Sequence, residues 1–201
     1  MAKRSATTLA DVALTDDQRD RRQRVIDAAF ELGADQGYDA VQMRDVAASA
    51  NVALATIYRY FPSKDALLLA AMAEWTARLQ ARVAQSPPRG DTPADQLTDV
   101  LHRACNAMQR QPKLSQALVR ALASADAGVE EGSVRTREQI AALGAGVLGD
   151  LDAATQSDII SVLGHVWYST LVAWANGRTE FSTVTSELER AVRALVEPHY
   201  A

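Results

Sequence analysis

Several features that would assign a class of protein at once are scarce in this 201-residue chain. It has one cysteine, Cys105, so it cannot form an internal disulfide or a cysteine-based zinc site. No stretch approaches the roughly 20 consecutive apolar residues of a membrane-spanning helix. Residues 1–15 hold no apolar run that could serve as a signal-peptide core. These absences predict a soluble protein of a reducing cytoplasm with no membrane partner.

Positive charge is also in deficit. The chain has 21 Lys and Arg against 25 Asp and Glu, a formal net charge of −4. This balance excludes a protein that coats nucleic acid through bulk charge. Residues 1–65 are not basic either, yet their cations cluster at 19–24 and recur at Arg44, Arg59 and Lys64. Such placement fits binding through a few positioned contacts.

Helical periodicity, by contrast, runs through most of the chain. Apolar residues recur at spacings of three and four, and no segment shows strand alternation flanked by hairpin turns. We therefore predict an all-α fold that follows a flexible tail, residues 1–15. The predicted helices, about nine, cover residues 16–35, 43–50, 53–60, 64 to a linker at 85–90, 93–111, 113–124, 133–151, 155–175 and 182–197.

Local signals fix several helix ends. Gly37 ends the first helix, and Ser63 is a good N-cap for the long fourth helix. Thr92 caps the fifth helix, whose first residue is a proline that has no N–H to satisfy. Thr155 begins a Thr-Gln-Ser-Asp segment that predicts a capping-box start for the eighth helix.

Residues 43–61 have the layout of a helix-turn-helix. Ala47 is small enough to let two helices approach closely, and Asn51 tolerates the left-handed conformation of a turn. Ile57 supplies an apolar anchor on the second helix, which in such motifs lies in the DNA major groove. Taken alone, this spacing fits three short helices of an ordinary bundle equally well.

The second helix can be projected at about 100° per residue. With Ile57 inward, Ala53, Tyr60 and Phe61 fall on the inward side, whereas Ala55 and Arg59 fall opposite. An outward arginine can donate two hydrogen bonds to guanine O6 and N7.

Neighbouring positions suit the DNA backbone. Thr56 and Tyr58 carry hydroxyls suited to phosphate oxygens. Lys64 opens the next helix, where a cation and free backbone N–H groups both attract phosphate.

The Gly-Tyr-Asp-Ala turn at 37–40, the helix-turn-helix and the run from Tyr58 to Lys64 together resemble the TetR family of transcriptional regulators. The resemblance implies a DNA-binding domain (16–64) and a ligand-binding and dimerisation domain (65–201), with the last two helices pairing across a two-fold axis. Together with the projection, it implies DNA contacts at Gln42, Arg44, Leu54, Ala55, Thr56, Tyr58, Arg59, Tyr60 and Lys64.

Three positions depart from the family pattern. Where the family often has Ser, Lys and Gly, this chain has Ala53, Leu54 and Ala55. Leu54 and Ala55 are suited to thymine methyl groups, which leaves Arg59 as the main hydrogen-bonding base reader. The operator sequences of better-known members therefore do not carry over.

Shorter segments at 40–44, 108–112, 125–127, 166–169 and 173–174 resemble the actinobacterial repressors of sterol catabolism. This implies a bulky apolar effector, such as a coenzyme A thioester derived from a sterol or another lipid. Met and Trp side chains suit such ligands. Candidate effector contacts, each equally explained by core packing, are Met72, Trp75, Cys105, Met108, Leu118, Leu122, Trp167 and Tyr168.

Other sites find little support. Gly144, Gly146 and Gly149 spell GxGxxG, but no strand precedes them, so no cofactor is predicted. His102 and His165 are candidate ligand partners or simply hydrogen-bonded residues, and the histidine spacing suggests no metal site. No constellation of catalytic groups can be assembled, so no enzyme is predicted.

The favoured interpretation is a homodimeric repressor that an effector releases from a near-palindromic operator. The fourth helix is the predicted lever, because it joins Lys64 at the DNA to Trp75 beside the expected pocket. The alternative from another class is an α-helical ligand-binding or interaction module with no specific operator.

Overall fold

The computed structural model describes residues 14–124, 141–142 and 144–200, and across these ranges the chain is helical with no strand. The all-α prediction is confirmed. The elements are α1 (Asp16–Gln36), η2 (Tyr38–Ala40), α2 (Met43–Ser49), α3 (Leu54–Tyr60), α4 (Lys64–Gln85), α5 (Pro93–Arg110), α6 (Pro112–Leu122), α8 (Ala153–Ala175), α9 (Phe181–Val196) and η3 (Glu197–His199). Within the described ranges, none of these helices has the length and apolar character needed to cross a bilayer.

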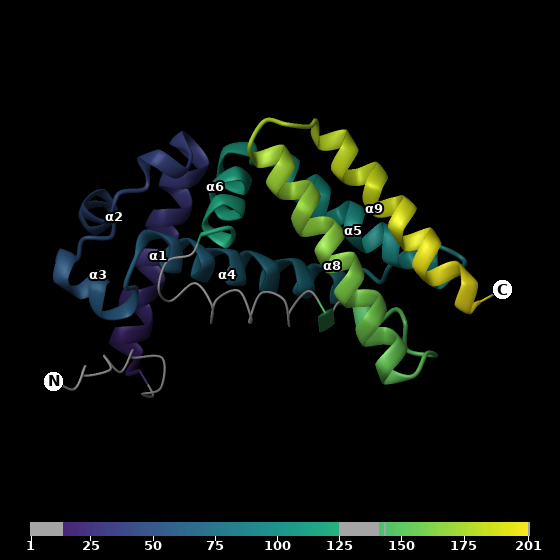
Figure 1. Ribbon diagram of the computed structural model, residues 1–201. Helices are drawn as coiled ribbons and strands as arrows, with labels where there is room; N and C mark the ends of the chain where they lie inside the picture. Colours follow the sequence, from purple (N-terminus) through teal and green to yellow (C-terminus); the bar gives the residue numbers. More distant parts are fainter. Residues whose placement is uncertain (1–13, 125–140, 143, 201) are drawn as a thin grey trace, which may run out of the picture.

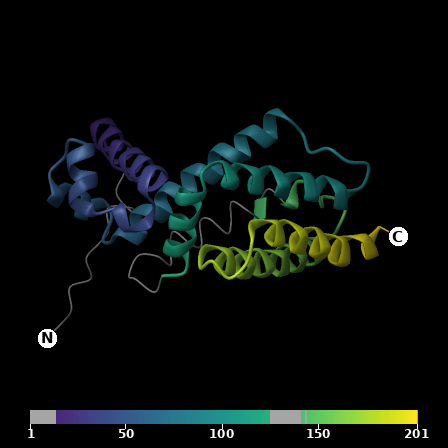
Figure 2. The ribbon, with the colours of Figure 1, turned by 90° about the horizontal axis from the view of Figure 1, so that it is seen from above.

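The molecule is elongated, with two regions joined by one long helix (Figure 1). We call α1, η2, α2, α3 and the first turns of α4 the head, and the remaining described helices the body. Helix α4 runs from the head into the body, while α6 stands between the two regions (Figure 1). Seen from above, α8 and α9 lie side by side, and α4 and α5 are joined far from the head (Figure 2).

Most predicted helix ends are confirmed by their caps. Gly37 ends α1 with φ of 87°, a left-handed conformation that glycine adopts without strain. The Ser63 hydroxyl accepts a hydrogen bond from the N–H of Ala66 at 3.1 Å. Thr92 does the same for Asp95 at 3.2 Å. These side chains satisfy N–H groups that the first turn of a helix leaves unpaired.

The predicted starts of the last two helices are wrong. Helix α8 begins at Ala153, because the Asp152 carboxylate accepts hydrogen bonds from the N–H groups of Ala154 and Thr155 at 3.0 and 3.1 Å. Thr155 therefore lies inside the first turn and is not its cap. Helix α9 begins at Phe181, one residue before Ser182.

The predicted helix at 133–151 can be judged only at its end, since residues 125–140 lie outside the described residues. Residues 141–142 and 144–145 are helical, and turns follow from residue 146. The predicted end at 151 is too late, because Gly146 and Gly149 are poor helix formers. The GxGxxG segment thus sits at the end of a helix, without the preceding strand that a dinucleotide site requires.

Two apolar cores hold the molecule together, and α4 and α6 contribute to both. The head core includes Val25, Ile26, Val46, Ile57, Phe61, Leu68, Leu69 and Leu114. The body core includes Leu79, Leu97, Leu101, Met108, Val119, Leu163, Trp167 and Leu188. Helix α6 also approaches α1 closely, since a Cβ at Gly33 would lie 3.1 Å from Leu114 Cδ1. Helices α4 and α6 therefore connect the two cores.

Candidate DNA-binding surface and effector core

The turn of the helix-turn-helix has the geometry that its sequence predicts. Asn51 has φ of 52°, and the next N–H, of Val52, donates to the Ala47 carbonyl at 3.0 Å. Ala47 and Ile57 are buried, and Ile57 is fully enclosed. The Arg24 side chain of α1 reaches the carbonyl of Ala50 at 3.5 Å. Core packing and hydrogen bonds therefore hold α3 at a fixed angle.

The outer face of α3 is exposed. Leu54 and Tyr58 retain 41% and 51% of their accessible surface, which is high for large apolar or aromatic side chains. Ala55 and Arg59 are exposed as predicted, and Thr56 is half-buried. Arg59 makes no hydrogen bond or ion pair with any described residue. A rigid helix thus presents an uncommitted guanidinium and two apolar side chains to solvent.

Two expectations for α3 need correction. Ala53 is exposed, because it is the N-cap residue with extended backbone, so a helical projection does not apply to it. Tyr60 is only 9% exposed, and its ring centroid lies 6.3 Å from that of Phe61. Tyr60 packs in the head core, which leaves little of its side chain able to contact DNA.

Two further predicted contacts lie where α2 begins. Gln42 is the exposed N-cap residue of α2, and its side-chain amide donates to the Asp39 carbonyl at 2.9 Å. Arg44 has 80% of its side-chain surface exposed and lies 3.4 Å from the Asp45 carboxylate. Exposed ion pairs of this kind contribute little free energy. Arg44 is therefore able to exchange this partner for a phosphate.

Lys64 belongs to a set of contacts around one aromatic ring, which we call the Tyr38 cluster. Its Nζ lies 3.7 Å from the Tyr38 ring centroid and donates to the Tyr38 carbonyl at 3.2 Å. The Arg120 guanidinium of α6 lies 4.2 Å from the same centroid and 3.3 Å from the Asp39 carboxylate. The Tyr38 hydroxyl donates to buried Asp65 at 2.7 Å. The cluster joins η2 and the start of α4 to α6.

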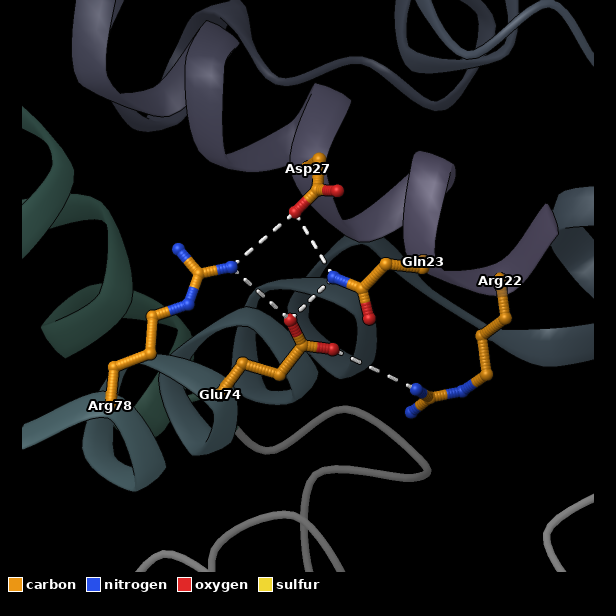
Figure 3. Close-up of polar contacts among 5 residues, drawn as sticks. All are labelled: Arg22, Gln23, Asp27, Glu74 and Arg78. Atoms are coloured by element: carbon orange, nitrogen blue, oxygen red, sulfur yellow. Dashed lines mark hydrogen bonds and ion pairs between the residues drawn. The ribbon is translucent and has the colours of Figure 1, made fainter. Parts of the chain in front are cut away.

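A second polar cluster joins α1 to α4 (Figure 3). The Gln23 amide donates to Asp27 at 3.0 Å and to Glu74 at 2.7 Å. Arg78 lies 3.6 Å from Asp27 and 3.8 Å from Glu74, and Arg22 lies 4.0 Å from Glu74. The sequence did not indicate this cluster, because α1 and α4 are far apart in the chain and each member alone is an ordinary polar surface residue.

The eight predicted effector contacts do not gather at one place. Met72, Leu118 and half-buried Leu122 pack in the head core. Cys105, Met108, Trp167 and half-buried Trp75 pack in the body core. Tyr168 is 42% exposed on α8. The predicted contacts are thus divided between two apolar cores and the surface, and the four in the body core come from α4, α5 and α8.

The Cys105 thiol and the Trp167 indole N–H are polar groups buried in the body core. Burial raises the pKa of the Cys105 thiol to about 11, against a hydrogen bond with Thr185 that lowers it. The indole Nε1 of Trp167 is enclosed and meets no acceptor among the described residues. Buried indole N–H groups usually find a partner.

Two of the three histidines lie close to oxygen atoms of their neighbours. His102 Nε2 lies 2.6 Å from Glu189 Oε1, in an open groove of about 440 Å³ between α5 and α9. His165 Nδ1 lies 2.7 Å from the Ser161 carbonyl, one turn earlier in α8. Within the described ranges, no group of three or more His, Cys, Asp or Glu side chains is placed to hold a metal ion.

A buried helix-turn-helix core with an exposed second helix, followed by a helical body, defines a class of one-component DNA-binding regulators. Residues 25–71 match the family described as bacterial regulatory proteins of the tetR family, and residues 90–195 match the tetracyclin repressor-like C-terminal domain. The chain belongs to the TetR family. It is therefore a member of a family of transcriptional regulators and not of an enzyme family.

Individual relatives agree with both predicted resemblances, which are confirmed. The transcriptional repressor KstR of Mycobacterium tuberculosis is 37% identical over 180 residues, 89% of this chain and 82% of that protein. KstR of Rhodococcus jostii is 37% identical over 194 residues, 96% of this chain and 91% of that protein.

Solved structures show the same fold. A TetR regulator from Rhodococcus sp. RHA1 has a TM-score of 0.81 at 28% identity, covering 90% of this chain and 98% of the other. Thermus thermophilus FadR in complex with lauroyl-CoA has a TM-score of 0.69 at 23% identity, covering 88% and 93%.

Proposed function

We propose that the protein is a homodimeric transcriptional repressor that a bulky apolar effector releases from a near-palindromic operator. The observation that carries the proposal is the exposed α3 face, held on a helix-turn-helix core, with an Arg59 that pairs with none of the described residues. The similarity to KstR, a named repressor, supports the regulatory role. The fold shared with FadR bound to lauroyl-CoA supports a coenzyme A thioester, derived from a sterol or another lipid, as the effector.

In this proposal the α3 face enters the major groove. Arg59 donates two hydrogen bonds to a guanine, and Leu54 and Ala55 contact thymine methyl groups. Contacts to phosphates come from the half-buried Thr56 and the exposed Tyr58 on α3, and from Gln42, Arg44 and Lys64 around it. Lys64 would hold its phosphate beside the N-terminus of α4, where backbone N–H groups also attract an anion.

The proposed division into a DNA-binding domain (16–64) and an effector domain (65–201) leaves α4 as the connection between them. Helix α6 adds a second connection, since its Arg120 binds the Tyr38 cluster and its Lys113 Nζ donates to the Asp35 carbonyl at 2.7 Å. An effector that shifts α4 or α6 would therefore move the head and misplace α3. This coupling is the proposed route of release.

The dimer is proposed to form through α8 and α9, with two helices from each copy. The support is a stripe on α8 that the described residues leave at least partly open: Val162 and Ser169 are exposed, and Val166 and Ala173 are half-buried. Small side chains there would let two copies approach closely. In such a dimer the two heads would be related by a two-fold axis. They would enter successive major grooves about 34–36 Å apart.

Quantitative footprinting on the DNA upstream of the protein's own gene tests the proposal, with scrambled DNA of equal length as the control. We expect protection of two inverted half-sites roughly one helical turn apart, with affinity that falls steeply as salt rises. Equal affinity for upstream and scrambled DNA at every salt concentration would contradict a specific operator.

A further inference from the structure

Trp167 carries a buried hydrogen-bond donor that the described residues leave unsatisfied. The side chain is 9% exposed, its Nε1 is enclosed, and no acceptor among the described residues lies within hydrogen-bonding geometry. Enclosed donors without acceptors are rare, because folding removes their hydrogen bonds to water and no hydrogen bond within the protein replaces them. The position therefore calls for an explanation beyond ordinary packing.

Burial in the body core does not by itself leave an indole N–H without a hydrogen-bond acceptor. Trp174 lies two turns further along α8 and is equally buried, yet its N–H is not among the enclosed donors that lack an acceptor. Its ring packs edge-on against Phe181, with centroids 4.9 Å apart and an interplanar angle of 85°. Trp174 thus has the contacts of a structural aromatic residue and is a matched control for Trp167.

Trp167 belongs to the apolar body core. The body core brings it together with Leu79 of α4, Met108 of α5 and Leu163 of its own helix. Half-buried Trp75 of α4 packs against the same core. In such an environment a hydrogen bond is stronger than in water, and a ligand without an acceptor would gain nothing from this donor.

We propose that Trp167 Nε1 donates a hydrogen bond to a carbonyl oxygen of the effector, so that the part of the ligand inside the body core is apolar except for a carbonyl. The inference rests on the proposed function, because it assumes an effector in the body. Two sources supply this chemistry, the thioester carbonyl of an acyl coenzyme A and a ring ketone of a steroid. Trp167 is thereby a specificity-determining residue.

Binding measurements on the full-length protein with two matched ligand pairs test this assignment. One pair is lauroyl-CoA and its thioether analogue dodecyl-CoA, and the other is a 3-ketosteroid and its 3-deoxy counterpart. We expect the wild-type protein to prefer the carbonyl member of one pair by roughly five- to tenfold, the effect of one hydrogen bond. Trp167→Phe should abolish the preference, and Trp174→Phe should retain it. The pair that responds identifies the source of the carbonyl.

A spectroscopic measurement on the wild-type protein tests the same hydrogen bond and does not require the Trp167→Phe variant to fold. In ¹⁵N-tryptophan-labelled protein, the Trp167 indole proton should shift downfield on adding the preferred carbonyl ligand, and less on adding its partner. Equal affinity for both members of both pairs overturns the assignment of Trp167 but leaves the proposed effector class intact. Failure of all four probes to bind overturns that effector class and the assignment together.

Discussion

The head and the body differ in where their candidate ligand contacts lie. In the head the candidate contacts with DNA lie on the surface, and the buried residues, such as Ile57 and Tyr60, only hold α3 in position. In the body most of the candidate contacts with the effector lie inside, and the exposed surface of α8 is the proposed site of contact with a second copy. A rigid surface suits a ligand as stiff as DNA, whereas an apolar interior suits a ligand that must leave water.

The largest expected effect is the loss of folding stability when a large buried side chain is truncated in either core. Ile57→Ala in the head and Leu188→Ala in the body should each lower the free energy of unfolding by about 2–5 kcal/mol. Because α4 and α6 belong to both cores, we expect one cooperative transition for each variant in urea denaturation followed by circular dichroism. Two separate transitions would show that the regions are independent and would break the proposed coupling.

Arg59→Ala tests the surface chemistry of the head. We expect the loss of about 1–3 kcal/mol of operator binding and a relaxed preference at one base pair per half-site, because a bidentate contact is removed. Fluorescence anisotropy on operator and scrambled DNA measures both effects. Arg110→Ala, which removes a cation from the end of α5, is the control. An equal loss on the two DNAs would reassign Arg59 to a phosphate contact.

Arg120→Gln tests the connection between the regions. It removes a cation that lies over Tyr38 at a partly exposed site, an interaction of about 0.5–1 kcal/mol. We expect the effector to release the operator less efficiently, while binding of the free protein to DNA changes little. Release is measured by titrating effector into the protein–operator complex, with Arg110→Gln as the control. An unchanged release curve would show that the Tyr38 cluster does not take part in the coupling between effector binding and operator release.

The smallest expected effect concerns Cys105. Since burial raises the pKa of its thiol to about 11, the folded protein keeps this proton more tightly than the unfolded chain. The thiol should resist iodoacetamide at pH 8 and react once urea unfolds the protein. Its contribution to stability should be constant below pH 9 and fall as pH rises from 9 to 11. Rapid alkylation of the native protein at pH 8 would contradict the burial of this thiol.

The sequence predicted the head far better than the body. Asn51, Ile57 and Ser63 act on neighbours within a few residues, so their roles follow from local spacing. The Tyr38 cluster and the α1–α4 polar cluster join residues from distant parts of the chain, which no local pattern reveals. Local signals also mislead where two compete, as when Asp152 caps α8 in place of Thr155. That Trp167 meets no acceptor among the described residues follows only from its three-dimensional surroundings.

The central claim is that effector binding in the body and DNA binding by the head oppose each other. Isothermal titration of the effector into free protein and into protein saturated with operator tests it most directly. The account predicts weaker effector binding to the operator complex by about 5- to 150-fold, and the effector must weaken operator binding by the same factor. Equal effector affinity for free and operator-bound protein would contradict the account.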